Sequence, residues 1–440
     1  MVSLLSLFLT VSAAGASDFL AVAGSELTLR GNPVFLSGAN LPWINYGQDF
    51  GDGQSNGIAC ELQSFVTNVS KSGGNSIRLW LFVEGDSIPV FDDVTGDVTS
   101  TDRNNTLIKD VDTLAAFAAS QDVLINICLW NGALMRNQNV VDMVTNASKT
   151  QSFIDNALRP LVEALASRNG IGSWEILNEP EGSVLIDADD EPCFDTSNLA
   201  GTGAGWAGTG VRMQDLLRFI NQCGAAIKAA DPKALVNVGA WSEWTIYDID
   251  NDVADDSSAT PRDYYSDACL KKAGGHELGT MDFVQVHSYA WEGKYSESSP
   301  FSIPKSDFGV TKPILIGEFA SVDCAQGFLG GPELDDCSVQ QHYEWALTSG
   351  YAGIWDWALI GGESVDNATL CNTGMAAIAD ESLVQAVALD GEAPEDTCGC
   401  SDLAPDDEYS CAEQADWGKC SDVFMAGFCC LSCHACSGCT

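Results

Sequence analysis

The chain has 440 residues and a formal net charge of −42, because 62 Asp and Glu residues face only 20 Lys and Arg residues. A nucleic-acid backbone or an anionic lipid surface would repel such a chain, so we expect neither as a partner. The length suits one domain of about 250–400 residues with a small appendage, and the charge favours a neutral substrate such as an uncharged sugar.

The N-terminal segment, residues 1–16, is a short apolar run that ends in the small-x-small pattern Ala14-Gly15-Ala16. This pattern is typical of a signal peptide cleaved after Ala16, and a buried first strand is the alternative. No later apolar run approaches the ~20 residues that a membrane-spanning helix needs. We therefore expect a secreted, extracellular protein outside the membrane. Four glycosylation sequons agree with this route and begin at Asn68, Asn104, Asn146 and Asn367.

Residues 17–392 alternate short β-rich runs with helical stretches, which is the pattern of an α/β fold. Most of the β-rich runs are nearly continuous in apolar residues, as parallel strands covered on both faces should be. The eight predicted strands span residues 34–40, 76–82, 123–130, 173–179, 235–241, 282–289, 313–319 and 352–357.

Helical periodicity between the strands is clearest in residues 152–167, 213–232 and 338–350. The last of these opens with Ser338 and Gln341 at capping-box spacing. Eight alternating strand–helix units predict a (β/α)8 TIM barrel. The runner-up is an open doubly wound sheet, but no glycine-rich phosphate fingerprint follows the first predicted strand.

Cysteine usage divides the chain at a short acidic linker, residues 393–397. Of the 17 cysteines, nine crowd into residues 398–440. In a secreted chain this density predicts a small disulfide-rich domain, because about 40 residues cannot build an adequate core alone; zinc binding is the rival reading. In the body of the chain we expect loop disulfides between Cys193 and Cys269 and between Cys324 and Cys337, and a buried free thiol at Cys128.

Catalytic groups of TIM barrels sit at the C-terminal ends of the strands. Two of the predicted ends carry carboxylates, Glu179 after the fourth strand and Glu318 after the seventh. Aromatic and amide groups at the other ends suit a carbohydrate groove, because indole rings pack well on the apolar faces of sugars. The further side chains at these ends are Asn40, Trp43, Arg78, Trp80, Trp130, Asn131, Asn178, Trp241, His287, Tyr289, Trp355 and Trp357.

Paired carboxylates are what glycoside hydrolysis needs: one protonates the leaving oxygen and the other attacks the anomeric carbon, with the two about 5–5.5 Å apart in retaining enzymes. The fourth and seventh strands of an eight-stranded barrel lie nearly opposite each other, so we expect this short separation between Glu179 and Glu318. We expect Glu175 to be a structural ion-pair acid and Glu181 a rim residue. The four histidines lack ligand spacing, so we expect no metal and no cofactor.

Two strand-end motifs, "NEP" and "IGEF", resemble those of clan A glycoside hydrolases, specifically family five. Longer strings resemble the endo-β-1,4-mannanases of molluscs and other invertebrates: "FLSGANLPWINYGQDFG", "GGNSIRLWLFVEGDSIPVFD", "LWNGA", "EPCFDT", "GAGWAG" and "QVHSYAW". The resemblance covers roughly Leu27 to Leu359. It implies a TIM barrel that hydrolyses internal β-1,4 bonds of mannan, glucomannan or galactomannan by double displacement.

The resemblance also implies roles for the catalytic residues and their nearest partners. Glu179 would be the general acid/base and Glu318 the nucleophile. Asn178 would bond the 2-hydroxyl of the sugar in the −1 subsite. Arg78 would keep Glu318 ionised by lowering its pKa, and Tyr289 would orient Glu318.

Further substrate-binding roles follow from the same resemblance. His287 would line the −1 subsite. Trp355 would form the platform under the −1 sugar, with Trp357 as the alternative on the same face of the strand. Candidates for other subsites are Trp43, Trp130, Trp206 and Trp241.

The cysteine spacing of the tail resembles the ShK-toxin-like domain that is appended to many secreted animal enzymes. This resemblance implies disulfides Cys400–Cys436, Cys411–Cys429 and Cys420–Cys433, with Cys398–Cys439 as a plausible fourth. The tail is acidic and Lys419 is its only Lys or Arg. We therefore expect an accessory or substrate-tethering role rather than channel block.

The sequence is best interpreted as a secreted, monomeric, retaining endo-β-1,4-mannanase acting on a polysaccharide. An endo-β-1,4-glucanase on the same scaffold is the first alternative, because the two sugars differ at one hydroxyl group. A non-catalytic carbohydrate-binding protein is the second.

Overall fold

The computed structural model describes residues 17–247, 262–289, 295–320, 338–360 and 367–391, together with 409, 413–414 and 417–419. The predicted signal peptide, the linker, the Cys324–Cys337 pair and every predicted tail disulfide lie outside these residues. Within the described parts of the chain, no helix is both long and apolar enough to cross a membrane.

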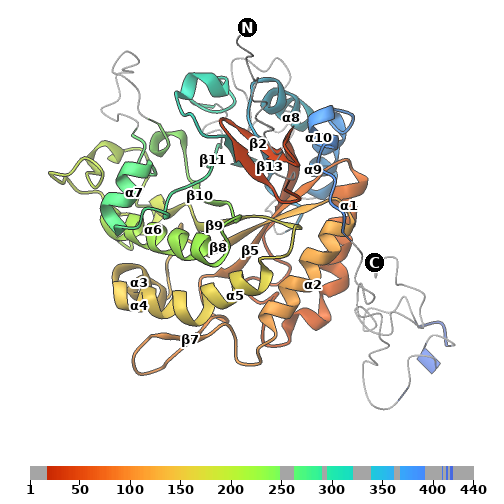
Figure 1. Cartoon of the computed structure of the whole chain (residues 1–440), viewed down its shortest axis with the longest axis horizontal. Helices are drawn as coiled ribbons and strands as arrows, with labels where there is room; N and C mark the ends of the chain where they lie inside the picture. The colour runs from red at the N-terminus through yellow and green to blue at the C-terminus, as the bar shows by residue number, and fades with distance from the viewer. Residues whose placement is uncertain are drawn as a thin grey trace, which may run out of the picture.

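Eight parallel strands close into a barrel, which confirms the predicted (β/α)8 architecture (Figure 1). Each predicted β-rich run contributes one strand. The last strand pairs with the first, with Trp355 opposite Gly38, and this pairing closes the barrel. In chain order the strands are β4 Leu36–Leu41, β5 Ser76–Val83, β8 Leu124–Asn131, β9 Ile171–Asn178, β10 Val236–Ala240, β11 Val284–His287, β12 Ile314–Glu318 and β13 Gly353–Asp356.

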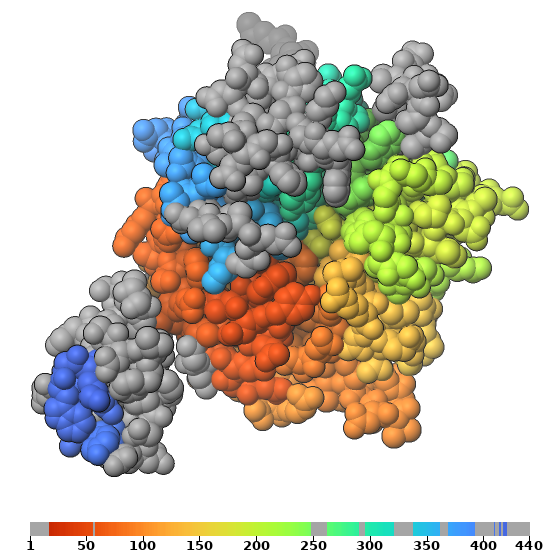
Figure 2. Space-filling model, turned by 180° about the vertical axis from the view of Figure 1, so that it is seen from behind, coloured from red at the N-terminus to blue at the C-terminus, as the bar shows by residue number. Residues whose placement is uncertain are grey.

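Helices cover the outside of the barrel (Figure 1). Seen from behind, the C-terminal segments in blue lie beside the N-terminal segments in orange, as a closed ring requires (Figure 2). Ser338 caps α8 as predicted, accepting a hydrogen bond from the Gln341 backbone N–H. The helices are α1 Ala59–Lys71, α2 Leu107–Ser120, α3 Gln138–Thr145, α4 Ala147–Phe153, α5 Arg159–Leu165, α6 Met213–Ala230, α7 Asp267–Gly274, α8 Val339–Thr348, α9 Asn367–Ala377 and α10 Ser382–Gln385.

Two small antiparallel sheets are separate from the barrel sheet. One comprises β1 Ala21–Ala23, β2 Glu26–Leu29 and β3 Asn32–Val34, and the other pairs β6 Val90–Phe91 with β7 Val98–Ser100. Leucines around the first sheet pack in one buried cluster with Trp355 and with Leu36, Leu124 and Leu315, which are the first or second residues of barrel strands. This apolar cluster fills the N-terminal end of the barrel and leaves the C-terminal end for polar groups.

Candidate active site

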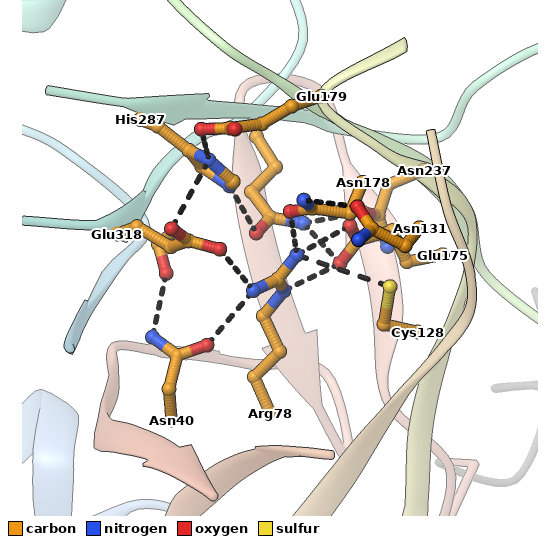
Figure 3. A network of polar contacts seen from close by, with 12 residues as sticks. Asn40, Arg78, Cys128, Asn131, Glu175, Asn178, Glu179, Asn237, His287 and Glu318 are labelled. Atoms are coloured by element: carbon orange, nitrogen blue, oxygen red, sulfur yellow. Dashed lines mark hydrogen bonds and ion pairs between the residues drawn. The ribbon is translucent and has the colours of Figure 1, made fainter. Parts of the chain in front are cut away.

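Glu179 and Glu318 meet at the C-terminal end of the barrel, as their strand positions predicted (Figure 3). Glu179 directly follows β9 and Glu318 is the last residue of β12. One oxygen of each carboxyl group lies within 4.8 Å of the other. His287, at the end of β11, lies between them: its Nδ1 is 2.7 Å from Glu179 Oε1 and 3.5 Å from Glu318 Oε2.

The Arg78 guanidinium on β5 connects the groups beneath this pair (Figure 3). It is fully buried, donates to both oxygens of Glu175 at 2.6 Å, and donates to Glu318 Oε1 at 2.6 Å. It also donates to the side-chain oxygens of Asn178 at 2.7 Å and Asn40 at 2.9 Å. A buried charge needs such partners. Glu175 is therefore the structural ion-pair acid that was predicted.

The two catalytic candidates have different electrostatic surroundings. Burial raises the pKa of Glu179 to about 7, although the Arg78 charge opposes this shift. Burial also raises the pKa of Glu318 above that of an ordinary glutamate, while His287, Arg78 and a hydrogen bond from Tyr289 oppose the rise. Arg78 lowers the pKa of Glu318, as predicted, but burial is the larger effect and the net pKa is raised. Direct donation to Glu318 still favours its ionised form.

The backbone at Glu179 adopts a conformation that few side chains tolerate. Its φ is 44° and its ψ is 55°, in the left-handed region, and Pro180 follows directly. The Glu179 N–H donates to Gly239 O at 2.7 Å, which ties the turn to β10. Backbone strain of this kind is concentrated at functional sites, where surrounding contacts hold it in place. The turn directs the Glu179 carboxyl over the barrel instead of along the strand.

A cavity of about 810 Å³ opens above the two glutamates. Its lining is rich in tryptophan. The lining residues are Trp43, Trp80, Asn131, Ala133, Asn178, Glu179, Gly201, Thr202, Gly203, Trp206, Trp241, Tyr289, Glu318 and Trp357.

The tryptophans form two groups on nearly opposite sides of the barrel mouth. Trp43, Trp80 and Trp357 contact one another, with ring centroids 5.5–6.1 Å apart, and come from the neighbouring strands β13, β4 and β5 or the turns after them. Trp206 and Trp241 contact each other at 5.6 Å and come from the β9–β10 side. Flat apolar surfaces thus flank the acid pair on both sides.

Comparison of the sequence with models of known protein families identifies the family of this chain. A family model described as cellulase (glycosyl hydrolase family 5) matches residues 27–361. The chain belongs to glycosyl hydrolase family 5. This membership agrees with the closed barrel and with the placement of two glutamates at its C-terminal end.

Relatives of this family 5 hydrolase include two curated mannan endo-1,4-beta-mannosidases. The protein of Cryptopygus antarcticus is 42% identical over 385 residues, which are 86% of this chain and 95% of that protein. The protein of Mytilus edulis is 39% identical over 358 residues, 81% of this chain and 92% of that one. Among solved structures, the endo-1,4-beta-mannanase of Eisenia fetida has a TM-score of 0.75 at 41% identity, covering 82% of this chain and 96% of its own.

Two of the predicted aromatic site residues of this hydrolase lie away from the cavity. Trp355 is fully buried in the apolar cluster at the opposite end of the barrel, and its Nε1–H donates to Ser76 Oγ at 2.9 Å. It cannot form the −1 platform, and the alternative Trp357 lines the cavity instead. Trp130 is also fully buried, packed against Phe82 and Phe153. It is not available to a sugar.

The other predicted residues lie at or directly beneath the cavity. Tyr289 OH donates to Glu318 Oε2 at 2.8 Å, in the position expected for orienting that carboxylate. Arg78 and His287 are fully buried and reach the acids from below, so neither forms the cavity surface. The remaining predicted cavity residues are Trp43, Asn178, Trp206 and Trp241. Trp80 and Asn131 stand at predicted strand ends, but sequence reasoning assigned them no role.

Glu181 is not the rim residue that was predicted. It is fully buried, and its Oε1 accepts from Thr245 Oγ1 at 2.7 Å and from Tyr265 OH at 2.6 Å. Its Oε2 accepts from the Trp241 backbone N–H at 3.2 Å. The side chain therefore fastens the turn after Glu179 to the segment that carries Trp241.

Replacing Glu181 with leucine is expected to destabilise the protein by about 2–4 kcal/mol, because two buried donors and one partly buried donor lose their acceptor. KM for long oligosaccharides should rise more than kcat falls, since the Trp241 side of the cavity is loosened. Urea unfolding and steady-state kinetics measure both effects. The exposed Glu163 on α5 gives the matched control, Glu163→Leu. Equal stability of the two variants would contradict the fastening role.

Glu179, His287 and Glu318 are the one group in the described parts of the chain whose potential ligand atoms lie close enough to hold a metal ion. The contacts already given engage these atoms in hydrogen bonding. The expectation of a metal-free reaction stays a prediction.

The predicted disulfide between Cys193 and Cys269 is confirmed. It ties the loop between β9 and α6, which carries Trp206, to α7. Cys128 is a buried free cysteine, also as predicted, and its Sγ lies 3.9 Å from Arg78 Nη2.

Proposed function

We propose that this family 5 hydrolase is a retaining endo-β-1,4-mannanase that uses Glu179 and Glu318. The observation that carries the proposal is the separation of their carboxyl oxygens, within 4.8 Å. Retaining glycosidases hold their two carboxyl groups about 5–5.5 Å apart, whereas inverting enzymes need about 6.5–9.5 Å to admit a water molecule. The short separation supports double displacement.

In the first step of this mechanism, Glu179 protonates the bridging oxygen while Glu318 attacks the anomeric carbon. The raised pKa of Glu179, about 7, keeps it protonated for this step. Arg78 and Tyr289 donate to Glu318 and orient it as the ionised nucleophile. In the second step, ionised Glu179 takes a proton from water, which then hydrolyses the glycosyl-enzyme.

The contacts around the −1 subsite support roles for two further residues. Arg78 holds Asn178 Oδ1, and this bond fixes the orientation of the amide beside the cavity. In the proposed complex, the Asn178 amide nitrogen donates to the 2-hydroxyl of the −1 sugar. Trp357 follows β13, next to the strand of Glu318, and would pack under that sugar.

Different observations support mannan as the substrate and cleavage at internal bonds. The two relatives named mannan endo-1,4-beta-mannosidase match more than four-fifths of the chain at 39–42% identity. The two tryptophan groups flank the acid pair, so sugar units can bind on both sides of the cleaved bond, which supports endo action.

Product analysis on mannohexaose and on polysaccharides tests the proposal. We expect hydrolysis of mannan and glucomannan, internal cleavage of the hexamer, and the β-anomer as the first product by NMR. Turnover of carboxymethylcellulose with inert mannan would make the chain a glucanase, the alternative that the cellulase description of the family keeps open. First release of the α-anomer would contradict retention.

The pH profile of kcat/KM should be bell-shaped. Activity needs protonated Glu179, so it should fall as pH rises through about 7, the pKa to which burial raises that group. Activity also needs ionised Glu318, whose pKa is raised, so the acid limb should lie above the ordinary glutamate pKa. Glu179→Gln should lose the basic limb. An unchanged basic limb in that variant would exclude Glu179 as its source.

We also propose that the protein is secreted, with an accessory disulfide-rich tail. The Cys193–Cys269 disulfide supports an oxidising route. Asn104 and Asn146 are exposed and accessible to glycosylation, whereas Asn68 lies in α1 and donates to Asn372 Oδ1 at 3.1 Å, which speaks against a glycan there. Deleting residues 395–440 should leave oligosaccharide hydrolysis unchanged if the tail is only accessory.

A further inference from the structure

Gln285 lies two residues before His287 on β11 and has no place in the mechanism given above. It is fully buried, and its side-chain amide group donates to Glu175 Oε2 at 2.7 Å and to Asn237 Oδ1 at 2.8 Å. Glu175 is paired with Arg78, so it can only accept. Asn237 uses its own NH₂ group to donate to Ser173 Oγ at 3.1 Å. Both partners therefore fix the NH₂ end of Gln285.

The fixed amide places an oxygen against His287. Gln285 Oε1 lies 3.4 Å from His287 Nε2. An amide oxygen only accepts, so Nε2 must carry the hydrogen. Burial lowers the pKa of His287 to about 4, so the ring is neutral near pH 7 and carries one N–H. Nδ1 is then the ring's acceptor.

This tautomer constrains Glu179. His287 Nδ1 lies 2.7 Å from Glu179 Oε1. Two lone pairs at that distance would repel each other, so one of the two atoms must carry a hydrogen. Because Nδ1 is an acceptor, the hydrogen belongs to Glu179. The raised pKa of Glu179 agrees with this assignment.

Two glycines make room for the arrangement. A Cβ on Gly317, the glycine of "IGEF", would lie 1.9 Å from Gln285 Oε1. A Cβ on Gly239 would lie 3.1 Å from His287 Nε2 and 2.5 Å from Glu175 Oε1. A larger residue at either position would displace the very atoms that set the tautomer.

We propose that Gln285 is a positioning residue that fixes His287 as its Nε2–H tautomer and thereby holds Glu179 in its acid form. The proposal rests on the proposed role of Glu179 as general acid. The carboxyl torsion of glutamate is soft. When substrate binds, rotation of the Glu179 carboxyl group therefore carries its proton away from His287 Nδ1 and toward the leaving oxygen.

The other titratable groups that face the pair come from several strands and act in both directions. Glu318 on β12 and Glu175 on β9 favour a proton on the Glu179–His287 pair, while the Arg78 charge on β5 disfavours it. Tyr289 lies beside Glu318, and Cys128 on β8 lies beside Arg78. None of these groups contacts His287 Nε2 in the way that Gln285 does, so Gln285 decides between the two tautomers.

Nitrogen-15 NMR of the histidine rings in the full-length, substrate-free protein near pH 6 tests the tautomer directly. The chain has only four histidines. His342 provides an internal reference of opposite type, because its Nδ1 lies 2.8 Å from Ser338 O and its Nε2 accepts from Tyr295 OH at 3.0 Å. We expect Nε2–H for His287 and Nδ1–H for His342. An Nδ1–H or a doubly protonated His287 would overturn the proposal.

Gln285→Met removes the oxygen and keeps the length of the side chain. We expect the Nδ1–H tautomer of His287 to become populated and to stabilise ionised Glu179. The basic limb of kcat/KM should then move down by about one pH unit, which is about a tenfold loss of kcat/KM above that limb. Gln63→Met, at a buried position in α1, is the matched control and should leave the limb in place.

The outcomes separate the two proposals. A folded Gln285→Met variant with unchanged tautomer and unchanged pH limb would refute the positioning role, whatever the substrate. Inert mannan together with Nε2–H His287 would refute the proposed function and leave the tautomer assignment standing. If the variant does not fold, the wild-type spectrum still decides the tautomer.

Discussion

Glu318→Ala should lower kcat by at least roughly 10⁴-fold, because no other group can attack the anomeric carbon from that side. Thermal unfolding should show a folded protein, since Arg78 keeps its bidentate pair with Glu175. The assay is release of reducing sugar from mannan. Residual activity within tenfold of the wild type would rule out Glu318 as nucleophile.

Azide offers a sharper test of the Glu318 variant. With a dinitrophenyl mannobioside, whose leaving group needs little acid assistance, azide can enter the space that the carboxylate vacates. A single displacement from that face inverts the configuration, so the product should be the α-mannosyl azide. Glu163→Ala, at an exposed position on α5, controls for the substitution itself and should form no azide product.

Glu179→Ala should lower kcat on mannan by about 10²–10⁴-fold, because the leaving oxygen loses its proton donor. Turnover of the dinitrophenyl substrate should instead stop after formation of the glycosyl-enzyme, since water then lacks a general base. The measurements are steady-state rates on both substrates and the mass of the trapped intermediate.

Azide should restore turnover of the Glu179 variant and give the β-azide, because it needs no base and attacks the face opposite Glu318. Opposite product anomers from the two variants would assign acid/base and nucleophile independently. The same anomer from both would refute the assignment. Failure of the variant to form the glycosyl-enzyme from the activated substrate would also contradict a general-acid role, because that step needs little acid assistance.

The barrel and its two glutamates could be predicted from the sequence because each strand is a local apolar run and each acid stands at a strand end. The depth at which a strand residue lies within the barrel could not be predicted. Trp355 and Trp357 share a face, as alternation requires, but two residues along a strand amount to about 6.6 Å. That offset separates a packed interior position from the cavity surface.

Irregular strand pairing was also hidden from the sequence. Glu175 and Asn178 are three residues apart, so a regular strand would direct them to opposite faces. Both nevertheless contact Arg78. The register shifts between the pairs Asn237–Glu175 and Gly239–Asn178, so an extra residue in β9 returns Asn178 to the interior. The burial of Glu181 and the contacts of Gln285 likewise depend on neighbouring strands that no local pattern specifies.

The Cys193–Cys269 disulfide stabilises part of the substrate-binding surface of this enzyme but not its catalytic site. Both glutamates and the Arg78 network are held by the barrel itself, while the segment that carries Trp206 is cross-linked to α7. Recombinant protein made in a reducing cytoplasm would keep its catalytic site, but the segment that carries Trp206 would be held less firmly. Preparations from different hosts can therefore have the same activity on short oligosaccharides and different activities on long polymers.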